Sequence, residues 1–125
     1  MLTLPSVRLS HQDWACLMSL AFDAENDLHP VSTFLRAEVH RAIVMNDPST
    51  DVIRLNSWVT YRVDWSPNYS RLLVHPRDYV ADGHHLSVLS PVGAALIGIR
   101  VGDRMPFLDS SKNLHLVTPL NSLIR

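Results

Sequence analysis

Hydrophobic residues in the first third of the chain recur at intervals of three and four, the spacing of one helical face. The first such stripe runs over residues 10–22, from Trp14 to Phe22, and a second stretch covers residues 31–46. Pro30 is tolerated in the first turn of the second stretch, and Pro48 follows as a stop signal. We expect two helices of about fifteen residues that form an antiparallel hairpin. The alternative is that both helices simply cover a sheet.

After Pro48 the pattern changes to a period of two, which is typical of β-strands. Val59, Tyr61 and Val63 alternate with residues of the opposite face. We expect five strands, within residues 52–65, 69–76, 85–90, 99–109 and 113–120. Helices followed by a run of strands predict an α+β fold.

The clearest local pattern is LSVLSPVGAALIGIRVGD, residues 86–103. It reads as the end of a strand, a short helix and a turn. Ser90 is a suitable N-cap, Pro91 fits the first helical position, and Gly98 fits the residue that ends the helix. Val-Gly-Asp at residues 101–103 predicts a turn.

Charge and composition limit the classes of partner. Eleven Lys and Arg balance twelve Asp and Glu, with a net charge of −1. Direct nucleic-acid binding is therefore not expected, because phosphate neutralisation needs clustered cations. No apolar run approaches the ~20 residues of a membrane span, and the N-terminus does not read as a secretory signal. With one cysteine, Cys16, no disulfide framework is possible within the chain, and we expect a reducing, cytoplasmic setting.

Candidate catalytic and metal-binding groups do not assemble into a known pattern. The seven histidines include His84 and His85, which follow Asp82, but adjacent residues on a strand point to opposite faces. Cys16 lies on the apolar stripe of the first helix, where a buried thiol is expected. Gly93 and Gly98 do not form a phosphate-binding loop. We expect no metal and no cofactor.

One acidic loop keeps a second interpretation open. Asp23, Glu25 and Asp27 crowd the tip of the predicted hairpin, where carboxylates could hold a divalent cation. The alternative is a solvated turn.

Residues 86–103, together with RLNSWVTYRV at residues 54–63, resemble the C-terminal domain of the bacterial Gre transcript-cleavage factors. In that family a strand runs into Ser-Pro-Leu/Val-Gly-x-Ala-Leu-hydrophobic-Gly, followed by a Val-Gly-Asp turn. The resemblance covers roughly residues 10–108, although the helical part matches only in architecture. Within the family the chain is most similar to the Rnk type, the regulators of nucleoside diphosphate kinase.

The resemblance implies two parts. Residues 1–50 would form a short coiled-coil arm, and residues 51–125 an FKBP-like domain with a bent antiparallel sheet and one short helix. It also implies that the domain docks on RNA polymerase at the rim of the secondary channel. DNA or RNA would then be met only indirectly, through the polymerase. Prolyl isomerisation is not expected.

The resemblance also implies a docking site at the Ser-Pro corner. Ser90 and Pro91 match the family residue by residue, whereas Leu89 replaces a position that is often polar in the cleavage factors. Asp82 is included only because it lies in the loop before the strand that leads to this corner. The expected polymerase-binding residues are Asp82, Leu89, Ser90, Pro91 and Val92.

Three departures from the cleavage factors shape the expected function. The arm is far shorter, and DAEND at residues 23–27 lacks their acidic motif in a recognisable frame. FLDSSKNLHL at residues 107–116 replaces their Pro-Gly-Gly turn, so the resemblance does not define the geometry of the last hairpin. The leading hypothesis is therefore a polymerase-binding regulator that is not an enzyme.

Two other hypotheses stay open. In the first, the acidic tip still supports Mg²⁺-dependent transcript cleavage. In the second, the chain is a stand-alone interaction module whose hairpin pairs with another protein or with itself. A dimer broken by a charge at Leu17 or Leu35 would favour this last hypothesis.

Overall fold

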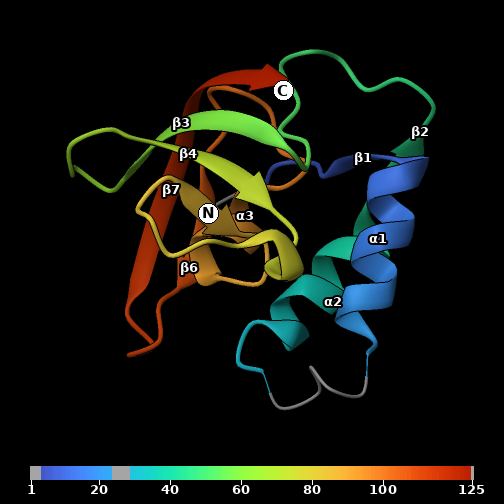
Figure 1. Cartoon of the computed structure of the whole chain (residues 1–125), viewed down its shortest axis with the longest axis horizontal. Helices are drawn as coiled ribbons and strands as arrows, with labels where there is room; N and C mark the ends of the chain where they lie inside the picture. The colour runs from blue at the N-terminus through green and yellow to red at the C-terminus, as the bar shows by residue number, and fades with distance from the viewer. Residues whose placement is uncertain (1–3, 24–28, 125) are drawn as a thin grey trace.

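The computed structural model of the chain describes residues 4–23 and 29–124 and shows a mixed α+β fold, as predicted (Figure 1). In chain order the elements are β1 (Arg8–Ser10), α1 (His11–Ala21), α2 (Ser32–Arg41), β2 (Ile43–Met45), β3 (Ser57–Val63), β4 (Tyr69–Val74), the 3-10 helix η2 (Pro76–Asp78), β5 (His85–Ser87), α3 (Pro91–Leu96), β6 (Met105–Leu108) and β7 (Leu114–Ile124).

The main sheet has five strands in the order β5-β4-β3-β7-β6 and curls around α3, which packs on β6 and β7. Its neighbouring strands are antiparallel except β4 and β5, which are parallel. The expectation of an antiparallel sheet is therefore wrong for the pair β4 and β5. After β4 the chain passes through η2 and the turn at Gly83, so β5 starts beside Leu72 and runs in the same direction as β4.

β7 is longer than the predicted strand over residues 113–120. From Val117 to Ile124 it pairs with the whole of β3, and the register shifts between Thr60 and Tyr61. Beyond this irregularity Ser122 and Leu123 pair with Val59 and Trp58. Because β3 provides partners along its full length, the strand continues past Pro119.

The two N-terminal helices are shorter than predicted, with 11 residues in α1 and 10 in α2. Ser10 caps α1, because its hydroxyl accepts the N–H of Asp13, as expected. The predicted second helix ran to residue 46, but α2 ends at Arg41 and Ile43 begins β2. β2 pairs in parallel with β1, and this pairing of a β-branched segment competes successfully with the helix.

The helices α1 and α2 contact each other beside the sheet (Figure 1). The segment that joins them, residues 24–28, lies outside the described residues. The antiparallel coiled coil and the FKBP-like character of the sheet stay predictions. None of the described helices is long and apolar enough to cross a membrane.

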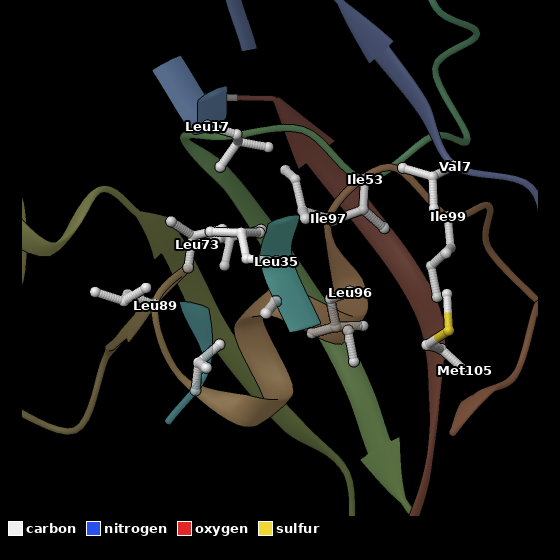
Figure 2. Close-up of a cluster of buried hydrophobic side chains, with 14 of the residues drawn as sticks. Val7, Leu17, Leu35, Ile53, Leu73, Leu89, Leu96, Ile97, Ile99 and Met105 are labelled. Carbon is white, nitrogen blue, oxygen red and sulfur yellow. The ribbon is translucent and has the colours of Figure 1, made fainter. Parts of the chain in front are cut away.

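One hydrophobic cluster joins these parts. Figure 2 shows side chains from the N-terminal segment, α1, α2 and α3 in the same cluster. Leu17 and Leu35, one from each N-terminal helix, are 0% exposed. Gly98, with φ of 81°, lies so close to Val7 and Leu9 that a side chain there would meet theirs. The division at residue 50 stays a prediction, but described residues from both ranges share this core.

Candidate functional site

The Ser90–Pro91 corner is built by a compact set of hydrogen bonds. The Ser90 hydroxyl accepts the N–H of Gly93 at 3.1 Å and donates to the carbonyl of Ser87 at 2.6 Å. Pro91 occupies the first turn of α3, where its missing N–H is not needed. Both local predictions, the Ser90 cap and the proline start, are confirmed.

A groove of about 740 Å³ opens beside this corner. Its walls come from three places in the sequence: the approach to α2 and its first turn, the Leu89–Pro91 corner, and the end of β6 with the following turn. The lining residues are His29, Pro30, Val31, Thr33, Phe34, Leu89, Ser90, Pro91, Phe107, Leu108, Asp109, Ser110 and Lys112. Most of the lining is apolar, and Leu108 is 55% exposed.

The structure brings three of the five expected polymerase-binding residues to the groove. Leu89, Ser90 and Pro91 line it, although Leu89 is otherwise buried in the core. Val92 packs against the core from a half-buried position and does not line the groove. Asp82 lies in the exposed turn before β5, where its carboxylate accepts the N–H of His84 and has a lowered pKa because of that bond.

The other two walls of the groove were not expected from the sequence. At one wall the His29 side chain accepts the N–H of Val31 and so shapes the approach to α2. At the other, Lys112 has φ of 64°, which marks a tight turn between β6 and β7. Contacts between segments about sixty to eighty residues apart produce no local sequence pattern. The one feature of the sequence that could have indicated the groove is the apolar Leu108 beside polar turn residues.

His115 of β7 holds the turn beside the groove. Its Nδ1 lies 2.6 Å from a carboxylate oxygen of Asp64, and its Nε2 lies 2.7 Å from one of Asp109. The hydrogen bonds to Asp64 and Asp109 raise the pKa of His115. The same contacts lower the pKa of Asp64 and of Asp109, which also accept backbone N–H groups.

A smaller polar cleft of about 220 Å³ lies between α1 and the segments before β3 and after β4. Asp13 lines it, and its carboxylate accepts the N–H of Leu55 at 3.2 Å. Burial raises the pKa of Asp13. Cys16, expected to be buried, is only half-buried at this cleft, and desolvation raises the pKa of its thiol. A raised pKa leaves a smaller fraction of this thiol as the nucleophilic thiolate at neutral pH.

The acidic loop cannot be placed as a set. Asp23 is exposed just after α1, whereas Glu25 and Asp27 lie outside the described residues. Over residues 4–23 and 29–124, no group of three or more His, Cys, Asp or Glu side chains is arranged to hold a metal ion. His85 accepts the N–H of Val80 and so takes part in its own loop.

Comparison with known proteins identifies relatives. Residues 48–114 match the family described as transcription elongation factor, GreA/GreB, C-term. The regulators of nucleoside diphosphate kinase from Escherichia coli K12 and Shigella flexneri are each 39% identical over 77 residues, which is 59% of this chain. The chain spans 57% of the length of these relatives.

A solved structure extends the likeness to the fold. The prokaryotic transcription elongation factor GreA/GreB from Nitrosomonas europaea is 28% identical and superposes with a TM-score of 0.75. The alignment covers 94% of this chain and 99% of that one, so it includes the N-terminal helices. Because the family match covers more than half of the chain and contains the Ser90–Pro91 corner, the chain belongs to the GreA/GreB C-terminal domain family of transcription elongation factors.

Proposed function

We propose that the protein is a transcription regulator of the Rnk type that binds RNA polymerase through the groove at the Ser90–Pro91 corner. In this proposal the domain docks at the rim of the secondary channel. Membership of the elongation-factor family supports polymerase as the partner. The similarity to regulators of nucleoside diphosphate kinase supports the Rnk type.

The observation that carries the proposal is the position of the groove. The corner that the family resemblance pointed to forms one of its walls, with Pro91 half-buried beside the exposed Leu108. Covering an apolar depression and the exposed leucine at its rim removes apolar surface from water, which favours binding of a partner surface. Interfaces of this kind depend on a few central residues, so Pro91 and Leu108 are the best candidates for that role.

Ser90 contributes to docking through shape. Its hydroxyl hydrogen is already donated to the Ser87 carbonyl, and its oxygen accepts the Gly93 N–H. A partner would therefore meet a corner that Ser90 has fixed. Ser90→Asp would place a carboxylate next to the Ser87 carbonyl and change the corner itself, so Pro91→Ala is the cleaner probe of contact.

We propose further that the protein binds without stimulating transcript cleavage. At 1.5 Å per residue, the 11 residues of α1 extend only about 16 Å. A short arm supports docking without insertion of acidic groups into a distant catalytic centre. The relatives are named regulators and factors, which agrees with a protein that is not an enzyme.

The alternative, a stand-alone module whose hairpin pairs with another protein or with itself, stays open. Leu17 and Leu35, where a charge was to test it, are both 0% exposed within the core. A charge at either position would destabilise the whole fold, so it could not report on a dimer.

The test is binding of the purified full chain to core RNA polymerase, with Pro91→Ala as the variant. We expect the wild-type chain to co-purify with core polymerase at moderate salt and Pro91→Ala to bind more weakly, with an unchanged circular dichroism spectrum. Failure of the folded wild-type chain to bind would contradict the proposal.

A further inference from the structure

The strongest feature outside the corner is the bridge that His115 makes between two carboxylates. Asp64 follows β3, and Asp109 follows β6, so the imidazole of β7 ties two separate turns together. The His115 side chain is 27% exposed, and its ring lies against that of Phe107, with centroids 5.4 Å apart. The ring thus contacts the turn after β3 through Asp64, the turn after β6 through Asp109, and β6 itself through Phe107.

With both partners ionised, the geometry favours a proton on each ring nitrogen. A carboxylate is an acceptor, and neutral imidazole carries a single N–H. Neutral His115 would therefore place a lone pair against one of the two carboxylates, whereas imidazolium donates to both. Over the described residues, the charged groups whose interactions with His115 shift its protonation are Asp64 of the β3–β4 turn and Asp109 of the β6–β7 turn; Phe107 of β6 is uncharged.

The bridge is continuous with the groove. One Asp109 oxygen contacts His115, while the other accepts the N–H groups of Ser111 and Asn113. The backbone carbonyl of Asp109 also accepts the N–H of Lys112. Asp109 therefore organises the turn that carries Lys112, and both residues line the groove.

Phe107 gives a second route from His115 to the groove. Its ring faces the imidazole and is itself 5% exposed, and it lines the groove next to Leu108. Movement of the His115 ring would therefore shift Phe107 on the apolar side of the groove as well as the turn at Asp109. Both routes act on the wall formed by residues 107–112.

We propose that protonated His115 is a positioning residue that holds the wall of residues 107–112 in the shape that receives the partner, so that docking weakens when the ring loses its proton. The docking part of this inference rests on the proposed function. Deprotonation removes one of the two charge-assisted hydrogen bonds, so the imidazole no longer ties the Asp64 and Asp109 turns together and the wall after β6 is held less tightly.

The first experiment tests the bridge without a partner. Nitrogen-15 NMR of the full chain follows both ring nitrogens of His115 and the amides of Ser111 and Asn113 across a pH titration. We expect a midpoint above the ordinary histidine value of about 6.5, with the two amides changing at the same midpoint. Asp109→Asn should lower that midpoint. An ordinary or lower midpoint in the wild-type chain, or amides that ignore it, would overturn the inference.

The second experiment measures binding to core RNA polymerase from pH 6 to 9 for wild type, His115→Gln and the matched control His11→Gln. His11 is an exposed histidine on α1, away from the groove lining. We expect affinity to fall through the His115 midpoint in wild type and in His11→Gln, and to lose this step in His115→Gln.

The possible outcomes separate the two proposals. The same pH step in His115→Gln would overturn the positioning role of His115. Absence of polymerase binding at every pH would contradict the proposed function and the docking part of the inference. The NMR titration would then still decide, by itself, whether the protonated bridge holds the turn.

Discussion

Gly93 of α3 lies directly against the backbone carbonyl of Ser87, so closely that a Cβ at Gly93 would overlap the Ser87 oxygen. The same carbonyl accepts the Ser90 hydroxyl and the Ser90 N–H. The start of α3 is thus packed on the end of β5 with no room for a side chain. This contact explains why the corner needs glycine at a position where alanine would be the better helix former.

We therefore expect Gly93→Ala to lower the free energy of unfolding by about 1–3 kcal/mol, the usual cost of overpacking. Alanine at a helical position without such a contact would stabilise the protein by up to about 1 kcal/mol. Urea denaturation followed by circular dichroism measures the difference. A variant as stable as wild type, or more stable, would show that the Ser87 carbonyl moves away without cost.

Two substitutions of the buried Asp13 distinguish the contribution of its hydrogen bond from that of its charge. Burial raises the pKa of Asp13, and its carboxylate accepts the N–H of Leu55. Asp13→Asn keeps an acceptor oxygen and removes the buried charge, so we expect stability close to wild type at pH 7. Asp13→Ala leaves the Leu55 N–H without that partner and should cost about 1–3 kcal/mol. Equal losses for both variants in urea denaturation would contradict this assignment.

The His115 bridge predicts a window of pH in which it stabilises the fold. Because the pKa of His115 is raised on folding, its contribution is fully present below the unfolded value of about 6.5 and is lost as pH rises through the folded pKa. The pKa values of Asp64 and Asp109 are lowered, so their contribution is present above the unfolded value and is lost as pH falls through the folded pKa.

The measurement is the unfolding free energy of wild type minus that of His115→Gln at a series of pH values. We expect the difference to be largest between the unfolded carboxylate value of about 3.9 and pH 6.5 and to shrink on either side. His11→Gln is the control and should show no such maximum. A difference independent of pH would mean that His115 acts through packing alone.

The short N-terminal helices predict an outcome for transcript cleavage. Added to stalled elongation complexes with Mg²⁺, the protein should release no cleavage product above the intrinsic rate of the polymerase. Glu25→Gln and Asp27→Asn, in the segment outside the described residues, should change nothing in this assay. Stimulated cleavage that these substitutions abolish would favour the alternative in which the acidic tip is active.

Local patterns predicted the corner well. Three residues there have purely local roles, so the sequence alone predicts them. Ser90 caps α3, Pro91 has the fixed φ of its first turn, and Gly98 has the positive φ after its end. Ser10 as the cap of α1 was predictable for the same reason. The alternation of Val59 and Tyr61 with Trp58 predicted a strand, and in β3 Val59 and Tyr61 are buried whereas Trp58 is exposed.

The parts that sequence reasoning missed depend on partners far along the chain. Residues 43–45 form a strand because they pair in parallel with β1. The local sequence, which has a helical pattern, does not predict this pairing. The groove is lined by His29 and Lys112 together with Pro91, and His115 contacts Asp64, which is 51 residues away. Such pairings are decided by tertiary packing, which local propensity does not contain.

The central claim is that the groove beside Pro91 receives RNA polymerase, and one matched pair of variants tests it directly. Leu108 lines the groove and is 55% exposed, whereas Leu123 is 64% exposed on the same sheet and does not line it. Glutamate at either position adds the same charge to an exposed strand residue.

The measurement is the dissociation constant for core polymerase of wild type, Leu108→Glu and Leu123→Glu, each first shown to unfold at a similar urea concentration. We predict that Leu108→Glu weakens binding by about tenfold or more, the effect of losing one central interface residue, and that Leu123→Glu binds like wild type. Equal affinity of Leu108→Glu and wild type would contradict docking through this groove.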